Sequence, residues 1–305
     1  MDLSINFFGE KLKNPLFLPS GIVTDIPSHI NAIRAGAGLV VLKSITLKPR
    51  VGNPLPRIVK FSSGFLNSVG LTNPGLKEGI KQISQLMKKS TTPLVVSIFS
   101  TSIKEFVVMA EEILEIKPFA LELNLSCPNL RHETNIIISH QGKSSFEAVR
   151  AVKRLVGKMP VFAKLSPNVE NISEIAKWCQ EGGADAISAI NTVAPAMVID
   201  IKKKQPMLGA KVGGVSGPAI KPIAIRCVYE IYQAVNIPII GMGGVTSWQD
   251  AVEMMMAGAT LVGVGSAVYL KGWAVYQQII EGIKKFLKRE NFKEIKSLIG
   301  LAHQN

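Results

Sequence analysis

The 305-residue sequence has few cysteines. Cys127, Cys179 and Cys227 are an odd number, they are widely spaced, and no Cys-x-x-Cys pair occurs. This usage excludes a disulfide framework and a cysteine-ligated metal or iron–sulfur site within this chain, and it is typical of a reducing compartment. We therefore predict a cytoplasmic protein without a metal site.

Long apolar runs are also missing. No stretch approaches the roughly 18 consecutive apolar residues that a membrane-spanning helix needs. At the N-terminus, Asp2, Asn6, Glu10 and Lys11 interrupt the apolar residues, which argues against a targeting segment. The sequence therefore predicts no membrane association.

Acidic residues are scarce relative to basic ones, with 22 Asp and Glu against 35 Lys and Arg and a net charge of +13. Such a charge is compatible with nucleic acid, an anionic ligand or an acidic partner protein. The basic residues are dispersed apart from clusters at 88–89, 202–204 and 284–289, and aromatic residues do not alternate with them as on a base-stacking surface. We interpret most of the charge as solvated helix faces and predict no nucleic-acid partner.

The chain does contain a regular alternation of short apolar and amphipathic segments, which follows an N-terminal β-hairpin predicted for residues 3–14 with its turn at Gly9 and Glu10. The apolar segments predict eight strands, at 16–20, 39–43, 94–99, 119–125, 161–165, 186–190, 238–241 and 261–264. Helices are predicted at 29–37, 75–89, 103–116, 145–156, 172–181, 222–234, 247–257 and 272–289. Eight such units are typical of a TIM (β/α)8 barrel, so we predict an α/β protein with a single domain spanning residues 1–305.

Long loops are expected after the second, fourth and sixth strands, on the side where barrel enzymes keep their chemistry. Lys43 and Lys164 end apolar strands on this side. Because a buried lysine is costly without a partner, we expect a carboxylate or phosphate ligand beside them. The glycine-rich turns at 241–244 and 263–266, after the last two strands, favour a bound phosphate because glycine lets backbone N–H groups approach an anion.

The segment 121–130, Leu-Glu-Leu-Asn-Leu-Ser-Cys-Pro-Asn-Leu, combines a strand pattern with a thiol at its end. Pro128 ends the strand because proline cannot donate to the ladder, so Cys127 lies just past it. The carboxamides of Asn124 and Asn129 flank this thiol, an arrangement that suits a flat, amide-rich ligand held beside a base. The alternative is a buried cysteine that acts only as a small apolar side chain.

Six segments together resemble class 1 dihydroorotate dehydrogenases, and they run in order across nearly the whole chain, at 66–75, 122–129, 164–168, 191–192, 213–219 and 239–244. Within class 1, the segments 199–202, 205–206 and 213–222 look most like the class 1B catalytic subunit. Class 2 enzymes differ, because they use a serine base and an N-terminal membrane-binding extension, whereas this chain has Cys127 at the base position.

The resemblance implies FMN-dependent oxidation of dihydroorotate to orotate in pyrimidine biosynthesis. Cys127 would be the general base that removes the C5 proton while hydride passes from C6 to flavin N5. The implied substrate-binding residues are Lys43, Asn67, Ser68, Val69, Gly70, Leu71, Asn124, Asn191 and Thr192. The implied FMN-binding residues are Ser20, Gly21, Lys43, Ser44, Asn124, Lys164, Ile190, Gly217, Gly243, Gly244, Gly265 and Ser266.

The class 1B likeness further implies a partner subunit with FAD and a [2Fe–2S] cluster that passes electrons to NAD, around a homodimer core of a heterotetramer. NAD, fumarate and other electron acceptors stay open at this point. The chain departs from the family pattern at 130–141, beside Cys127, and at 97–100, where an Asn-containing segment that ends in Gly is common.

The sequence leaves two other functions open. A dihydrouridine synthase-like reductase of uracil-like rings would suit the positive charge, but those enzymes carry a C-terminal helical RNA-binding domain, and this chain ends about 40 residues after its last predicted strand. A barrel that binds a phosphorylated metabolite without redox chemistry would explain the glycine-rich turns alone.

Overall fold

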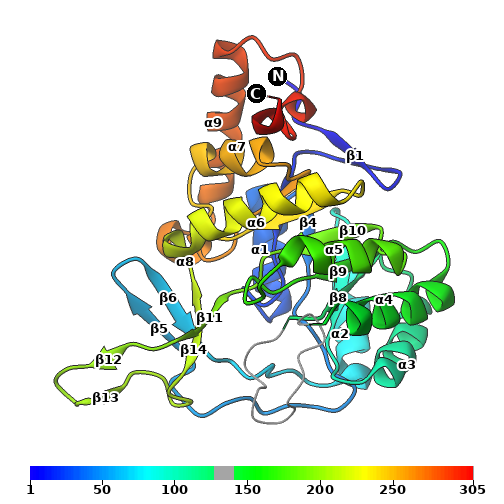
Figure 1. Ribbon diagram of the computed structural model, residues 1–305, viewed down its shortest axis with the longest axis vertical. Helices are drawn as coiled ribbons and strands as arrows, with labels where there is room; N and C mark the ends of the chain where they lie inside the picture. The colour runs from blue at the N-terminus through cyan, green and yellow to red at the C-terminus, as the bar shows by residue number, and fades with distance from the viewer. Residues whose placement is uncertain (127–140, 305) are drawn as a thin grey trace.

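The computed structural model describes residues 1–126 and 141–304, and its centre is a closed barrel of eight parallel strands (Figure 1). This confirms the predicted TIM barrel. In barrel order the strands are β3 (Leu16–Leu18), β4 (Leu39–Val41), β7 (Leu94–Ile98), β8 (Ala120–Asn124), β9 (Val161–Lys164), β10 (Ala186–Ala189), β15 (Ile239–Met242) and β16 (Leu261–Gly263), and β16 pairs with β3.

Strand β8 is buried along its entire length, although polar residues alternate with leucines in it. Its even-numbered side chains lie on one face and its odd-numbered ones on the other, as in any strand. The register places Glu122 opposite Ser97 of β7 and Asn124 opposite Lys164 of β9. Polar residues from three neighbouring strands therefore lie side by side over two successive levels near the C-terminal ends of these strands.

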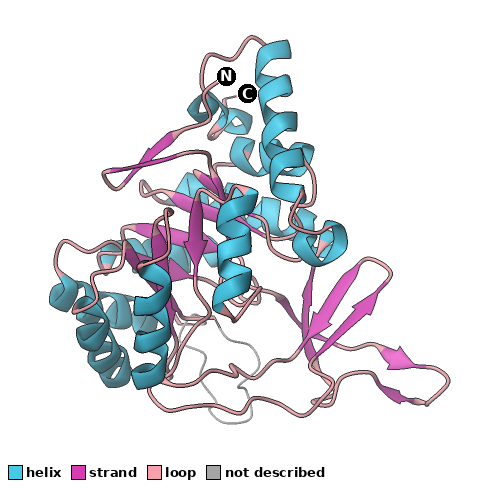
Figure 2. Cartoon of the chain, turned by 180° about the vertical axis from the view of Figure 1, so that it is seen from behind, coloured by secondary structure: helices cyan, strands magenta, loops and turns pink. Residues whose placement is uncertain are grey.

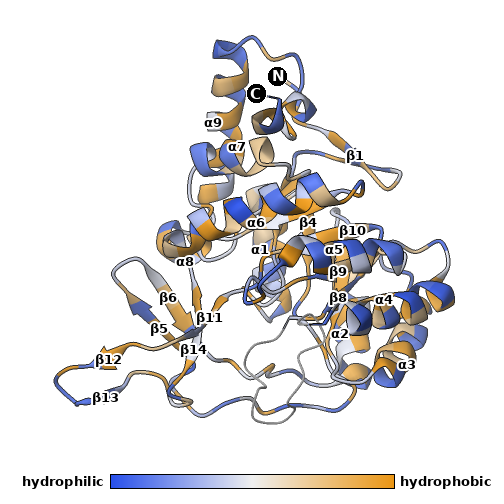
Figure 3. Cartoon of the chain, in the orientation of Figure 1, coloured by the Kyte–Doolittle hydropathy of each residue, from blue (hydrophilic) through white to orange (hydrophobic). Residues whose placement is uncertain are grey.

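Helices surround the barrel, and Figure 2 shows them outside the strands. Hydrophilic and hydrophobic residues occupy different sides of α3, α4 and α5 in Figure 3, because each helix buries one face against the strands. The helices are α1 (Ile26–Ala35), α2 (Leu76–Met87), α3 (Ile103–Leu114), α4 (Gly142–Val156), α5 (Ile172–Glu181), α6 (Lys221–Ala234), α7 (Trp248–Met256), α8 (Ala267–Lys271) and α9 (Val275–Arg289), with short 3-10 turns at Pro218–Ile220, Ile295–Leu298 and Leu301–His303. Among the described residues, no helix is both long and apolar enough to cross a membrane.

Three helix predictions were wrong in their boundaries, one of them because α4 begins at Gly142 instead of residue 145. Helix α1 begins at Ile26 instead of residue 29, because the side chain of Asp25 accepts a hydrogen bond from the Ser28 amide at 2.8 Å and caps the first turn. The helix predicted at 272–289 begins at Val275, as α9, and a separate short helix that was not predicted, α8, precedes it and ends at Gly272, which has a positive φ of 70°.

The long connections after β4 and β10 build a second sheet, which the sequence did not predict. Its four antiparallel strands lie in the order β11 (Val193–Ala196), β14 (Gly213–Ser216), β6 (Gly64–Asn67) and β5 (Ile58–Phe61). The short hairpin of β12 (Ile199–Asp200) and β13 (Gln205–Pro206) extends from it at the lower left of Figure 1. This sheet stands over one side of the barrel mouth and gives the site residues that no barrel strand supplies.

The predicted N-terminal hairpin is confirmed, as β1 (Ile5–Phe7) and β2 (Glu10–Leu12), although its turn lies at Phe8 and Gly9. The Phe7 ring packs 5.8 Å from the ring of Phe162, measured between centroids. The hairpin lies near both chain termini, away from the barrel mouth (Figure 1).

Candidate active site

The C-terminal ends of the barrel strands and the four-stranded sheet enclose a cavity of about 200 Å³. Most of the side chains that the sequence indicated for substrate or ring binding line this one cavity. They are Ser20, Gly21, Lys43, Ser44, Asn67, Val69, Gly70, Leu71, Asn124, Lys164, Asn191, Thr192 and Ser266.

A narrower cavity of about 90 Å³ adjoins the first and shares Ser20, Lys164 and Ser266 with it. Glycines from three separate connections line it, together with Ile190. They are Gly217 before α6, Gly243 and Gly244 after β15, and Gly263 and Gly265 at the end of β16. The two glycine-rich turns that the sequence singled out therefore meet at one place.

Two of these positions accept only glycine. Gly243 and Gly244 have φ values of +130° and +77°, and a Cβ on Gly244 would lie 2.8 Å from the backbone nitrogen of Lys221, at the start of α6. Without side chains, their peptide groups can approach a bound anion directly. The narrow cavity therefore fits a phosphate group, and the wider one fits a ring system attached to it.

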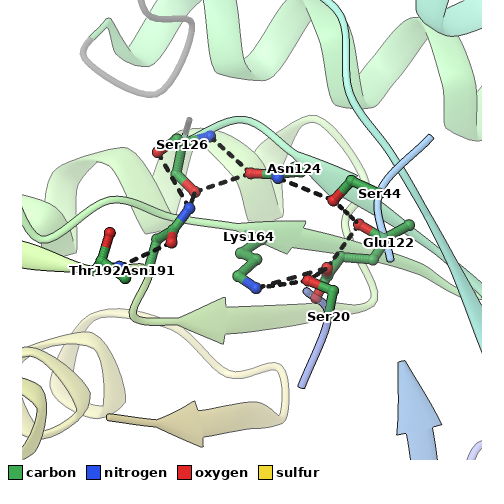
Figure 4. Close-up of polar contacts among 9 residues, drawn as sticks. Ser20, Ser44, Glu122, Asn124, Ser126, Lys164, Asn191 and Thr192 are labelled. Atoms are coloured by element: carbon green, nitrogen blue, oxygen red, sulfur yellow. Dashed lines mark hydrogen bonds and ion pairs between the residues drawn. The ribbon is translucent and has the colours of Figure 1, made fainter. Parts of the chain in front are cut away.

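Lys164 does not depend on a ligand for a counterion, contrary to the sequence-based expectation. Its ammonium nitrogen donates to the Ser20 hydroxyl at 2.8 Å and lies 3.9 Å from Oε1 of Glu122 (Figure 4). The Ser20 hydroxyl in turn donates to the same carboxylate oxygen at 3.1 Å. The barrel thus supplies the negative charge itself, from a carboxylate that is fully buried.

The carboxamides of Asn124 and Asn191 are fixed by hydrogen bonds to Ser44 and Ser126 (Figure 4). Asn124 Nδ2 donates to the Ser44 hydroxyl at 3.0 Å, and its Oδ1 accepts from the Ser126 hydroxyl at 3.1 Å. Asn191 Nδ2 donates to the same Ser126 hydroxyl at 2.9 Å, and its Oδ1 accepts from the Thr192 amide at 2.8 Å. Both groups are therefore held in a defined orientation before any ligand binds.

The loop after β6 supplies the opposite wall of the cavity. Asn67 Nδ2 donates to the carbonyl of Gly214 at 3.0 Å, which ties the loop to β14. Gly70 and Leu71 both have positive φ values, 71° and 57°. Of the residues indicated for substrate binding, Ser68 points elsewhere, since its hydroxyl accepts a hydrogen bond from Asn53 at 2.8 Å and it does not line the cavity.

Cys127, the predicted base, lies outside the described residues, as do Asn129 and the unusual segment 130–140. The two described cysteines, Cys179 and Cys227, are buried in helices α5 and α6. Burial raises the pKa of Cys179 to about 12 and also raises the pKa of Cys227. Neither thiol is therefore ionised at neutral pH, and neither lines the cavity.

Sequence reasoning missed several apolar residues of the cavity wall. Phe65 of β6 and Tyr269 of α8 line it, and their ring centroids are 6.1 Å apart in an edge-to-face arrangement. Ile22 and Ile58 also line the cavity. In the sequence these residues are marked only by lying near motif residues, because the cavity wall is built from segments that are distant in sequence.

Within residues 1–126 and 141–304, no cluster of three His, Cys, Asp or Glu side chains forms a metal site.

The family profile described as dihydroorotate dehydrogenase matches residues 2–287. The chain belongs to the dihydroorotate dehydrogenase family. The resemblance that the motifs indicated is thus confirmed, and members of this oxidoreductase family oxidise dihydroorotate in pyrimidine biosynthesis. The alternative reading as a dihydrouridine synthase-like or non-redox barrel is not favoured.

Several dihydroorotate dehydrogenases resemble the chain over its full length. A Pyrococcus abyssi protein named dihydroorotate dehydrogenase B (NAD(+)), catalytic subunit, is 46% identical over 301 residues, covering 98% of this chain and 99% of the relative. A Methanosarcina mazei protein of the same name is 44% identical over 298 residues, covering 97% and 94%. An Aquifex aeolicus protein named putative dihydroorotate dehydrogenase A (fumarate) is 41% identical over 310 residues, covering 100% and 99%. The similarity to class 1B catalytic subunits is therefore confirmed.

The fold is shared with a crystal structure of the dihydroorotate dehydrogenase of Eimeria tenella in complex with ferulenol. That structure superimposes with a TM-score of 0.84 at 22% sequence identity, and the match covers 99% of this chain and 89% of the other. At this identity the comparison bears on the barrel fold alone.

Proposed function

We propose that this chain carries out the family reaction, the oxidation of dihydroorotate to orotate, in the 200 Å³ cavity at the barrel mouth. The observation that carries the proposal is the convergence of Lys43, Asn67, Asn124 and Asn191 on that cavity. These side chains come from four distant parts of the chain. Three carboxamides and an ammonium group suit a pyrimidine ring with two carbonyl oxygens, two N–H groups and one carboxylate.

We assign the narrow cavity and the part of the wider cavity that Ser20, Ser44 and Lys164 line to FMN, and the rest of the wider cavity to the substrate. The glycine-lined cavity would hold its phosphate, and Lys164, Ser20 and Ser44 would hold the edge of its ring. FMN supplies the hydride acceptor when it is bound there. Lys164 contributes a positive charge, whose field stabilises negative charge on a reduced ring. Its bonds to Ser20 and Glu122 keep that charge at one place.

Cys127 is our candidate for the general base at C5 of the substrate. The residue directly before it, Ser126, is tied to both Asn124 and Asn191, so the strand end that leads to Cys127 is anchored at the substrate carboxamides. A thiol is ionised to only a few per cent at neutral pH when its pKa is about 8.5, so a base of this kind works better as the pH rises.

The partners also belong to this proposal. We infer a second subunit with FAD and a [2Fe–2S] cluster that passes electrons to NAD, around a homodimer of this single-domain chain, in the cytoplasm. Support comes from the names of relatives such as the Pyrococcus abyssi protein, which specify a catalytic subunit and NAD(+). Co-purification of the chain with a yellow-brown partner, followed by NAD reduction upon addition of dihydroorotate, tests this part.

The absorption spectrum of the purified chain, recorded under anaerobic conditions, tests the central claim. We expect a flavin spectrum that bleaches when dihydroorotate is added and that returns when an oxidant is added. A flavin that stays oxidised in the presence of substrate would reject dihydroorotate while retaining the cofactor. A colourless protein that does not bind added FMN would reject both.

A further inference from the structure

Glu122 is a buried carboxylate for which the sequence motifs suggest no role. Its side chain is 0% exposed, belongs to β8 and does not line the cavity. Oε1 accepts two hydrogen bonds, from the hydroxyl of Ser20 at 3.1 Å and from the hydroxyl of Ser97 at 2.9 Å. These two bonds belong to a longer chain of side chains that crosses the barrel mouth from Lys164 to Thr192 (Figure 4).

The direction of the bonds at the Lys164 end is fixed by chemistry. An ammonium group can only donate, so the Ser20 hydroxyl accepts from Lys164, at 2.8 Å, and its own proton is left for Glu122. A carboxylate can only accept, so Ser97 must also donate to Glu122. Glu122 therefore accepts one hydrogen bond from the Ser20 hydroxyl and one from the Ser97 hydroxyl.

The same constraint propagates from Ser97 towards the substrate. Since the single hydroxyl proton of Ser97 is committed to Glu122, Ser97 accepts from the Ser44 hydroxyl, 2.9 Å away. Ser44 has then used its own proton and accepts from Asn124 Nδ2 at 3.0 Å. The amide nitrogen of Asn124 thus faces Ser44, and its oxygen faces Ser126, whose hydroxyl and backbone N–H both donate to it.

The chain continues from Asn124 to the second carboxamide. Ser126 donates its hydroxyl proton to Asn124 Oδ1 and therefore accepts from Asn191 Nδ2, at 2.9 Å. Asn191 Nδ2 also donates to the backbone carbonyl of Ser126 at 3.3 Å, and Asn191 Oδ1 accepts from the Thr192 amide, so backbone groups fix the orientation of this carboxamide. Among the described residues, the second Nδ2 hydrogen of Asn124 has no acceptor, so this residue presents a donor to the cavity that it lines.

We propose that Glu122 is a positioning residue whose carboxylate sets the direction of the hydrogen bonds through Ser97 and Ser44 and thereby holds Asn124 Nδ2 as a donor to a carbonyl oxygen of the ring. This inference rests on the proposed function, because the ring concerned is that of dihydroorotate or orotate. Through its other arm, Ser20 and Lys164, the same carboxylate balances the charge beside the proposed flavin ring.

Two substitutions separate the two arms. Ser97→Ala removes the hydrogen bonds that connect Glu122 through Ser97 to Ser44 and Asn124, so we expect the dissociation constant of orotate to rise about three- to tenfold. Because Glu122 stays beside Lys164 in this variant, we expect no change in the flavin midpoint potential. Glu122→Gln changes both arms, because its amide can donate to Ser97 and no longer neutralises Lys164. We expect a similar loss of orotate affinity together with a more positive potential.

Ser188→Ala is the matched control. Ser188, like Ser97, is a fully buried serine of a barrel strand, here β10, but its hydroxyl has no hydrogen-bond partner among the described residues. It stands outside the chain of bonds from Lys164 to Thr192. We therefore expect the orotate dissociation constant of this variant to stay within about twofold of the wild-type value.

The experiment is a titration of the FMN-loaded full-length chain with orotate, followed by the flavin spectrum, with a parallel potentiometric titration. Wild-type affinity for orotate in both Ser97→Ala and Glu122→Gln overturns the positioning role, and an equal loss in Ser188→Ala does so as well. If Glu122→Gln does not fold, Ser97→Ala still decides the matter. If the wild-type chain does not bind orotate, the proposed function itself fails, which is a different result.

Discussion

The Lys164 ammonium and the Glu122 carboxylate lie 3.9 Å apart, with the two side chains 5% and 0% exposed, and the Ser20 hydroxyl bridges them. Removing one member of a buried ion pair leaves the other without compensation and typically costs about 3–5 kcal/mol. We predict that Lys164→Met lowers the free energy of unfolding by about 3 kcal/mol. Urea denaturation of the purified variant measures this change.

The double variant Lys164→Met, Glu122→Leu is the control for that prediction. Replacing both charges with apolar side chains removes the uncompensated carboxylate, so most of the lost stability should return. A double variant that is less stable than Lys164→Met would show that the carboxylate does not depend on Lys164.

A methyl group on Gly244 should weaken FMN binding. Gly244 has a φ of +77°, and the added Cβ would lie 2.8 Å from the Lys221 backbone nitrogen, so the turn must move away from its position at the narrow cavity. We predict that Gly244→Ala binds FMN at least about tenfold more weakly than wild type. Fluorescence quenching of added FMN measures this affinity.

Gly157→Ala serves as the comparison for Gly244→Ala. Gly157 also has a positive φ, +58°, but it ends α4, and a Cβ there would meet nothing within 4 Å. This variant therefore also places an alanine at a positive φ, but without a steric clash at the cavity. Normal FMN binding by Gly157→Ala alongside weak binding by Gly244→Ala is the expected result, and equal losses in both would contradict the assignment of the phosphate site.

The free energy of unfolding should decrease when the pH is lowered, and part of this decrease should depend on His29. This imidazole is buried, Nδ1 lies 2.7 Å from the Asp25 carbonyl, and burial lowers its pKa below the ordinary value of 6.5. Below pH 6.5 the unfolded chain therefore takes up a proton that the folded chain resists. The free energy of unfolding should decrease as the pH falls through this range, by up to about 1.4 kcal/mol per pH unit.

His29→Phe should remove that part of the pH dependence. Urea denaturation at a pH above 6.5 and at a lower pH, for the variant and the wild type, measures it. His303→Phe is the control, because His303 packs against the fold with its ring centroid 3.8 Å from that of Tyr229 but is less buried than His29. An unchanged slope in His29→Phe would assign the pH dependence to other groups.

The reductive half-reaction should depend on Cys127 and on pH. If this thiol is the base, the rate of flavin bleaching by dihydroorotate rises as the pH approaches the pKa of the thiol, which is about 8.5 in the absence of perturbation. Cys127→Ser has a far weaker base at the same position, so we predict a rate at least about 100-fold lower. Stopped-flow absorbance under anaerobic conditions gives both results, and an undiminished rate in Cys127→Ser would remove this residue from its role.

The sequence alone determined the barrel and the approximate site. Apolar strands such as 39–43 recur between amphipathic helices, and a closed parallel sheet is the structure that buries such strands on both sides. In a parallel barrel all strands end at the same rim. Lys43, Asn124 and Lys164 therefore had to lie near one another, even though 121 positions separate the first from the last.

Only the tertiary structure decided how these residues are connected. The second sheet joins β6 to β14, from two connections that have no shared local pattern. In the same way, Ser20 and Ser97 reach Glu122 from strand ends far away in sequence. Hydrogen bonds between side chains of different strands depend on barrel register and closure, which are properties of the folded chain as a whole.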